Sequence, residues 1–229
     1  MILIIENSKL RNKIHIFETR VEAGEILAEL IKEESIDVLL IIPNGGLPVG
    51  LGLIHNKIIQ PKSIDLLIVK KIHVPWSTES GMGAITPDGE LFLNDNLISY
   101  YSIENKQIQK QVEVTKERIQ NIRSKFGVSD DIDVKGKSVL IIDDGIASGF
   151  SMLAGASWLK NKEAKKILIG TPTAPGRSAR NLEDKVEKIY CVNIREGLSF
   201  AVADAYKNWF DLTLNEAVEY FQKIKNFLK

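Results

Sequence analysis

The sequence predicts an α/β protein with a mostly parallel, twisted sheet flanked by helices and interrupted by a β-hairpin flap. Short apolar runs alternate along the chain with amphipathic segments of helical period, an order typical of parallel sheets covered by helices. The apolar runs are continuous, which indicates strands buried on both faces. Two of these runs end in glycine-containing loops that lead directly into helices.

The length of the chain is enough for one large α/β domain or two small ones. The chain has 229 residues, 44% hydrophobic and 26% charged, and 30 basic residues balance 30 acidic ones. A net charge of zero gives no field that would attract nucleic acid or a membrane surface. The single Cys191 excludes an internal disulfide framework and a multi-cysteine zinc site. The apolar start of the chain ends at Glu6 and no membrane-length run follows, so we expect a cytoplasmic protein.

The N-terminal half predicts two buried strands. A capping box at Thr19 begins a helix that reaches about Glu34. The next strand is broken sharply by a proline and two glycines before a short helix follows. The second strand ends at two lysines, and paired lysines there could face an anionic ligand or be simply solvated. These elements are, in order, strand 38–42, loop 43–46, helix 47–54, strand 66–69 and Lys70–Lys71.

The segment from Ser77 to Asn94 is polar and glycine-rich, with a turn at residues 87–89. Short apolar runs flank that turn, so the segment predicts a β-hairpin, either a moving flap or a static excursion. Apolar residues at steps of four and three then predict a long helix over 104–126 that ends at Gly127. Arg118 and Arg123 lie on this helix and are interpreted as surface charges. The remaining expected elements are strand 139–142, helix 152–159, strand 166–170, loop 172–176, helix 178–183, strand 188–192 and helix 215–227.

The stretch from Ser138 to Ser151 carries the chemistry. A buried strand ends in Asp143 and Asp144, a small-residue loop follows, and a helix begins. The backbone amides of the loop and the positive end of the helix dipole form an anion site, with hydroxyl groups from Ser148 and Ser151 as extra donors. The carboxylates accept hydrogen bonds from vicinal hydroxyls or hold a hydrated cation. A ligand with a sugar diol and a terminal phosphate satisfies both halves.

This stretch resembles the phosphoribosyl pyrophosphate (PRPP) loop of type I phosphoribosyltransferases, and is similar to a subset with an Asp-Asp-Gly-Ile-Ala-Ser/Thr-Gly loop. The resemblance implies that Asp143 and Asp144 are catalytic and take the ribose hydroxyls. It implies a 5′-phosphate loop from Ala147 to Ser151. Gly145 departs from the aliphatic residue usual at its position. The PRPP-binding residues so implied are Asp143, Asp144, Gly145, Ile146, Ala147, Ser148, Gly149, Phe150 and Ser151.

The loop after the strand 38–42 resembles the pyrophosphate-binding loop of the same family. Asn44, Gly45 and Gly46 would hold the diphosphate through backbone amides, helped by Lys70 and Lys71. Relatives often place a basic residue where Asn44 stands, whereas Asn supplies dipoles but no net charge. The segment from Val69 to Glu90, and the aromatic segment after Cys191, also resemble the family.

The resemblance implies a phosphoribosyltransferase-like domain over residues 1–229, with a core at about 19–192 and a small hood from about 1–17 and 193–229. It implies an enzyme that uses PRPP and Mg²⁺ to transfer ribose 5-phosphate to a small-molecule nitrogenous acceptor such as a nucleobase, releasing pyrophosphate. No residue would bind the metal directly; Mg²⁺ would be held through PRPP, with water bridges to Asp143 or Asp144. A homodimer without nucleic-acid or membrane partners is expected.

Two alternatives use the same pocket: a non-catalytic PRPP-binding regulator or sensor, and a binding domain for another phosphorylated sugar. Other motifs are rejected. Gly136-Lys137-Ser138 lacks the earlier glycine of a Walker motif and precedes a strand, and two Gly-x-Gly sequences lack the third glycine of a dinucleotide fingerprint. The Asp pair follows a late strand, whereas receiver domains place theirs at the first.

Overall fold

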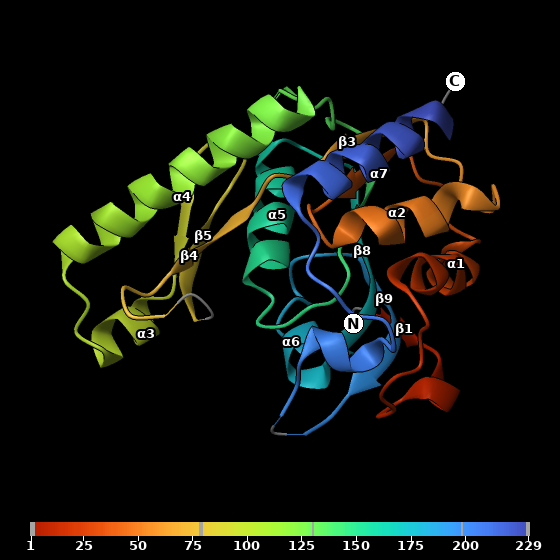
Figure 1. Cartoon of the computed structure of the whole chain (residues 1–229), viewed down its shortest axis with the longest axis horizontal. Helices are drawn as coiled ribbons and strands as arrows, with labels where there is room; N and C mark the ends of the chain where they lie inside the picture. Colours follow the sequence, from red (N-terminus) through yellow and green to blue (C-terminus); the bar gives the residue numbers. More distant parts are fainter. Residues whose placement is uncertain (1–2, 78–79, 130, 198, 228–229) are drawn as a thin grey trace.

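The computed structural model describes residues 3–77, 80–129, 131–197 and 199–227. The chain forms a body built on a parallel sheet, from which a second, smaller sheet and a long helix project (Figure 1). None of the helices within the described ranges is both long and apolar enough to cross a lipid bilayer.

The six strands of the body are all parallel and follow the order β1-β9-β8-β7-β2-β3. The strand order reverses beside β7, which is where ligands bind in open α/β sheets. The predicted fold class is therefore confirmed. The strands are β1 (Leu3–Glu6), β2 (Val38–Ile41), β3 (Ser63–Leu66), β7 (Ser138–Ile142), β8 (Lys166–Pro175) and β9 (Lys188–Arg195).

Helices cover both faces of this sheet, and alternate strand residues explain why. In β2, Leu39 and Ile41 belong to the core beneath α1 and α2, whereas Val38 and Leu40 belong to the core beneath α5. Since side chains of a strand alternate between faces, a strand between two helix layers must be apolar at every position. The body helices are α1 (Arg20–Ile31), α2 (Gly46–His55), α5 (Phe150–Asn161), α6 (Gly176–Arg180) and α7 (Leu214–Phe227), with short 3-10 turns η1 (Ser8–Leu10) and η2 (Val202–Ala205).

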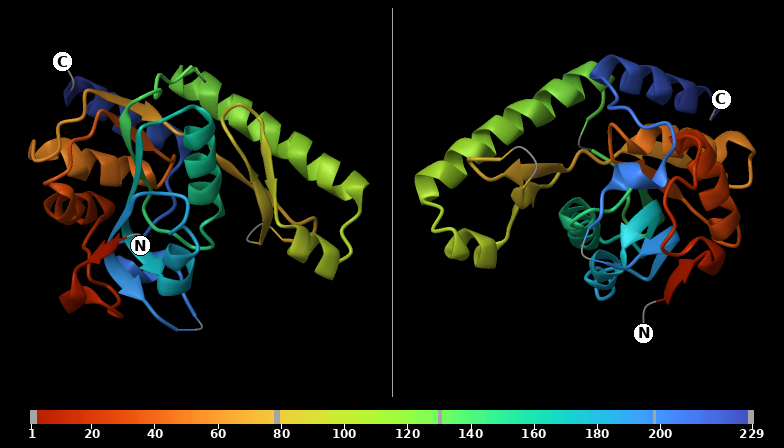
Figure 2. Two further views of the ribbon diagram at one scale, coloured as in Figure 1. Left: turned by 180° about the vertical axis from the view of Figure 1, so that it is seen from behind. Right: turned by 60° about the horizontal axis from the view of Figure 1, so that its bottom comes forward.

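Residues 70–126 project from the body, and we call this segment the arm (Figures 1 and 2). Three antiparallel strands form its sheet, and α4 packs along them before its last turn reaches α7, where Phe126 lies 5.6 Å from Phe221 between ring centroids. Gly127 ends α4 with a φ of 62°, as the sequence predicts. The arm contains β4 (Lys70–His73), β5 (Gly81–Ile85), β6 (Leu91–Leu93), α3 (Asp95–Tyr100) and α4 (Asn105–Phe126).

The predicted hairpin is present as β5 and β6, but β4 adds a third strand and α3 an unexpected helix. Residues 78 and 79 of the hairpin segment lie outside the described residues. The strand expected over 66–69 is displaced: β3 ends at Leu66, and Lys70 and Lys71 begin β4 instead of ending a parallel strand. Residues 67–69 are buried without being paired as a strand. The apolar run in the sequence could not distinguish such a buried segment from a strand.

Two more expectations are corrected in the C-terminal half of the chain. The loop expected over 172–176 is strand, because β8 continues beside β9 as far as Pro175. Its other neighbour, β7, ends at Ile142, so prolines there cost no ladder hydrogen bond on that side. The short helix begins earlier than expected, as α6.

Residues 3–6 lie within the segment expected to form the hood, yet they form β1 at the edge of the main sheet. Within the two segments expected to form the hood, 1–17 and 193–229, residues 1–2, 198 and 228–229 lie outside the described residues. The division of residues 1–229 into a core and a hood otherwise stays a prediction.

Candidate functional site

The loops after β2 and β7 touch each other at the carboxyl ends of the sheet. A Cβ atom on Gly45 would lie 1.9 Å from Oδ2 of Asp144, and one on Gly46 would lie 3.2 Å from the Cα of Asp143. Only glycine at position 45 lets the two loops approach this closely. The sequence predicted both loops separately, and the fold brings them together as expected for strand ends at one edge.

The acidic pair is held in place by hydrogen bonds. The Asp144 N–H donates to Oδ1 of Asp143 at 2.8 Å, and the Arg20 Nε–H donates to Oδ2 of Asp144 at 2.8 Å. Burial, and then the charge of Asp144, raise the pKa of Asp143 well above its ordinary value. Burial also raises the pKa of Asp144, but the Arg20 guanidinium opposes that rise. Asp144 is therefore the member held ionised, and Asp143 takes up a proton first as the pH falls.

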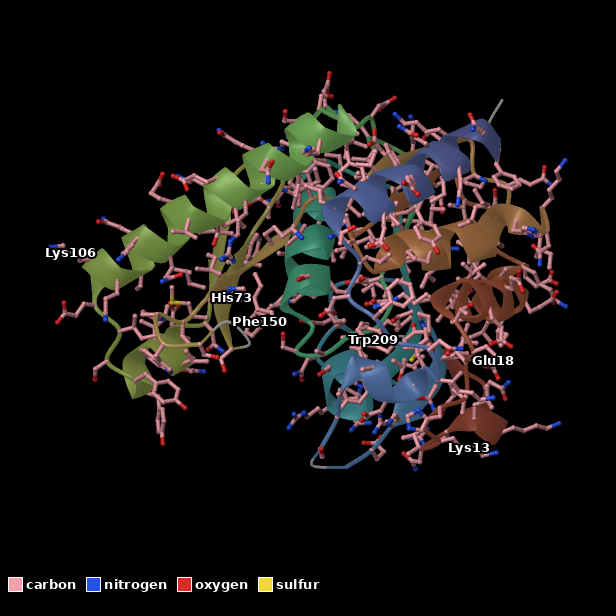
Figure 3. The ribbon with its side chains drawn as sticks, in the orientation of Figure 1. Lys13, Glu18, His73, Lys106, Phe150 and Trp209 are labelled. Carbon is pink, nitrogen blue, oxygen red and sulfur yellow. The ribbon has the colours of Figure 1, made fainter. Side chains whose placement is uncertain are left out.

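Arg20 is a site residue that the sequence reasoning missed. It is only 5% exposed, lies 3.7 Å from the ring centroid of Trp209, and donates from Nη1 to the Phe210 carbonyl at 3.0 Å (Figure 3). The Tyr206 hydroxyl donates to the Asp144 carbonyl at 2.5 Å. The aromatic C-terminal segment thus anchors the arginine that holds Asp144. One signal was available: Arg20 falls in helical register with the buried face of α1, where a charged residue needs a partner.

The loop from Gly145 to Ser151 leads into α5 and presents backbone donors. Gly149 has a φ of 85°, a left-handed conformation that favours glycine, and α5 begins at the next residue, Phe150 (Figure 3). The first amides of a helix have no partner within it and carry the positive end of its dipole. Ala147 and Ser148 are exposed. This arrangement suits an anion, as the sequence predicts.

Two residues of that loop serve to support it. Ile146 is 2% exposed and its N–H donates to the Thr173 carbonyl at 2.9 Å, so neither its side chain nor its amide is presented to a ligand. Gly145 packs against the C-terminal segment, because a Cβ there would lie 2.4 Å from Cγ1 of Val202. That contact explains why a glycine replaces the usual aliphatic residue.

A cleft of about 440 Å³ lies beside the acidic pair, between the strand ends and α4. Its cationic lining comes from Lys70 and Lys71 at the start of β4 and from Arg118 on α4. Burial lowers the pKa of the Lys70 ammonium group; the charge of Asp143 opposes that shift and the charge of Arg118 reinforces it. The lining residues are Ile42, Pro43, Asn44, Val69, Lys70, Lys71, His73, Thr115, Arg118, Asn121, Ile122, Asp143, Ser151 and Leu214.

Asn44 lines this cleft, but its donor is already used. Its Nδ2 donates to the Leu212 carbonyl at 3.2 Å, while its Oδ1 is buried and has no hydrogen-bond partner in the described structure. The Gly46 amide likewise donates to the Ile42 carbonyl at 3.2 Å. Of the three residues predicted in this loop, Asn44 therefore offers an acceptor, and Gly46 shapes the loop without a free amide.

The other conspicuous side chains lie apart from this cleft. Cys191 is buried in β9 and burial raises the pKa of its thiol, which fits a packing role. Arg123 lies beside a separate hollow near Pro87, whereas Arg118, interpreted from the sequence as a surface charge, is exposed but lines the cleft. Among the residues that the structure describes, no group of three or more His, Cys, Asp and Glu side chains could hold a metal ion by itself.

The α/β fold thus gathers an acidic pair, a loop that leads into a helix N-terminus and several cations at the strand ends of one parallel sheet. Residues 15–205 match the model of the phosphoribosyl transferase domain. The chain therefore belongs to the phosphoribosyltransferase family, as the resemblance implied.

Two further proteins are similar to this chain. A Mycobacterium tuberculosis protein, recorded in two strains and provisionally named a phosphoribosyl transferase, is 28% identical over 218 residues. The match covers 91% of this chain and 47% of the relative, so the chain spans about half the length of the curated relatives it matches. The crystal structure of the protein TT1426 from Thermus thermophilus shares the fold, with a TM-score of 0.68 and 23% identity over 89% of this chain and 96% of that one.

Proposed function

We propose that the protein is a phosphoribosyltransferase that transfers ribose 5-phosphate from PRPP to a nitrogenous acceptor such as a nucleobase. The observation that carries this proposal is the position of Asp143 and Asp144, between a loop of backbone donors on one side and a cationic cleft on the other. PRPP has the same order of groups: a 5′-phosphate, a ribose diol and a diphosphate. Family membership and the name of the mycobacterial relative agree with it.

In the proposed reaction, the bond from ribose C1 to the diphosphate oxygen breaks and pyrophosphate leaves with the electron pair. A bond from the acceptor nitrogen to C1 forms, and the acceptor releases a proton to solvent. Positive charge develops on the ribose ring, as in glycoside transfer. The Asp144 carboxylate, held ionised by Arg20 at 2.8 Å, would stabilise that charge and accept hydrogen bonds from the ribose hydroxyl groups. Residues 147–151 would hold the 5′-phosphate.

The site also fits Mg²⁺ bound together with PRPP. Mg²⁺ takes oxygen ligands and usually combines one or two protein groups with substrate phosphates and water. Asp143 places carboxylate oxygens on the cleft wall, and Mg²⁺ would neutralise part of the diphosphate charge there. Loss of PRPP binding on addition of a chelator would support this assignment. A homodimer, a cytoplasmic location and the absence of nucleic-acid partners stay predictions.

The test measures pyrophosphate release from PRPP and Mg²⁺ with a panel of nucleobases, using wild type and Asp144→Asn. Wild-type turnover with at least one acceptor, reduced at least a hundredfold in the variant, supports the proposal. Full activity of Asp144→Asn would refute the role of this carboxylate. A thermal-shift measurement with PRPP and with ribose 5-phosphate accompanies it, because a bound ligand raises apparent stability.

A non-catalytic PRPP sensor is the second candidate, and Asn44 favours it. The amide of this residue is committed to Leu212 and carries no charge to stabilise a leaving group. A sensor would bind PRPP tightly and release no pyrophosphate with any acceptor, whereas a binding domain for another phosphorylated sugar would show no preference for PRPP over ribose 5-phosphate.

A further inference from the structure

The cleft beside the acidic pair is lined by cations from two elements of the arm, β4 and α4. Lys70 comes from the first strand of the arm, and its Nζ donates to the Pro43 carbonyl at 3.2 Å, which places it against the loop after β2. Arg118 comes from the middle of α4, and its Nη1 lies 3.4 Å from Nδ1 of His73, another residue of the cleft wall (Figure 3). The guanidinium group is thus directed along β4 toward the cleft.

The protein compensates these charges only in part, through the charge of Asp143 near Lys70. Asp143 is the only carboxylate among the described residues that line the cleft. No carboxylate of the described residues lies within ion-pair distance of Lys70 or Arg118, although surface lysines on the same helix, such as Lys116, do have partners. Like charges that share a partly desolvated site repel each other. An anion with several charges in the cleft would therefore stabilise the arrangement of Lys70 and Arg118.

The loop after β2 cannot supply this charge, because the Asn44 amide and the Gly46 N–H already donate to carbonyl groups within the body. We propose that Arg118 binds the diphosphate of PRPP together with Lys70, and supplies from the arm the positive charge that Asn44 lacks. This inference rests on the proposed function. It assigns a ligand-binding role to a side chain that is exposed on a helix and was interpreted as a surface charge, although relatives carry basic residues near the active site in this region.

The proposal also gives the site a means of selecting its ligand. Ribose 5-phosphate carries one phosphate, which the loop at residues 147–151 would hold without the arm. PRPP adds a diphosphate that reaches the cleft, where a guanidinium group can bind phosphate oxygens in pairs. Arg118 should therefore strengthen binding of PRPP and of inorganic pyrophosphate, and leave binding of ribose 5-phosphate unaffected.

The experiment measures dissociation constants by titration calorimetry for PRPP, inorganic pyrophosphate and ribose 5-phosphate in the presence of Mg²⁺. It compares the whole wild-type chain with Arg118→Gln, Arg118→Lys and Lys116→Gln. Lys116 is the matched control: it is exposed on the same helix, pairs with Glu113 at 3.0 Å and does not line the cleft. Loss of one charged hydrogen-bond partner should weaken PRPP and pyrophosphate binding about tenfold to a hundredfold.

We expect Arg118→Gln to lose affinity for PRPP and pyrophosphate, Lys116→Gln to keep it, and Arg118→Lys to recover part of it. All four proteins should bind ribose 5-phosphate equally. Equal binding of that sugar also shows that the variants are folded. Wild-type affinity for PRPP in Arg118→Gln would overturn the inference, and so would equal losses for all three ligands. The wild type could bind pyrophosphate but not PRPP. If that pyrophosphate binding depended on Arg118, the anion site would be supported and the proposed function refuted.

Discussion

Glu34 allows a quantitative test of what stabilises the sheet. This carboxylate follows α1, its side chain is 7% exposed, and it accepts hydrogen bonds from Lys166 at 2.5 Å, Lys188 at 2.7 Å and Tyr190 at 2.6 Å. These three residues lie in β8 and β9. The bonds to them lower the pKa of Glu34 from 4.5 to about 2, although burial opposes the shift. One carboxylate thus joins α1 to two strands.

The shift of pKa sets the size of the effect. A difference of about 2.5 units, at about 1.4 kcal/mol per unit, corresponds to roughly 3 kcal/mol of folding free energy. Lys166 and Lys188 are about a third exposed, and solvent screening reduces this to about 2 kcal/mol. Because the pKa is lowered in the folded state, the contribution is complete above pH 4.5 and is lost as the pH falls toward 2.

The assay is urea unfolding of wild type, Glu34→Gln and the control Glu33→Gln at pH 7, 5 and 3. Glu33 is the exposed neighbour, and its substitution should cost about 0.5 kcal/mol or less. At pH 7 and pH 5 the Glu34 variant should be less stable by about 2 kcal/mol, and at pH 3 more than half of that difference should be gone. A difference that stays constant down to pH 3 would refute the electrostatic explanation.

Two further predictions concern the acidic pair. Gly45→Ala places a Cβ atom 1.9 Å from Oδ2 of Asp144, so PRPP affinity should fall more than tenfold; unchanged affinity by calorimetry would show that the loops do not need this contact. Arg20→Gln removes the group that opposes the raised pKa of Asp144, so the acidic limb of the pH–activity profile should move to higher pH, with Arg20→Lys restoring part of the shift. An unmoved profile would contradict the positioning role of Arg20.

Much of the fold follows from local pattern. Continuous apolar runs identified β2 and β7 because strands between two helix layers expose no polar face, and glycines marked the loops that follow them. The long helix α4 was found from its spacing and its terminal Gly127, since both signals lie within the helix itself. The chemistry of the strand ends could also be predicted, because parallel strands place their carboxyl ends together.

Other features depend on partners far apart in the chain. Arg20 meets Asp144 across 124 positions, and nothing near Arg20 specifies that contact. The edge strand β1 pairs with β9 from the far end of the sequence, so its four residues could not be distinguished from a hood segment. Arg118 is exposed on a helix, and only the position of that helix beside Lys70 makes it part of the cleft.

The last turn of α4 packs against α7 of the body, through Phe126 and Phe221, and this has a mechanical consequence. At about 1.5 Å per residue, Arg118 lies about 12 Å along the helix from that attachment and Lys106 about 30 Å. A tilt of about ten degrees around Phe126 would carry Lys106 (Figure 3) about 5 Å and Arg118 only about 2 Å. The outer end of α4 could therefore move far enough to admit a bulky molecule. The Arg118 guanidinium group would move little from the diphosphate that we propose it binds.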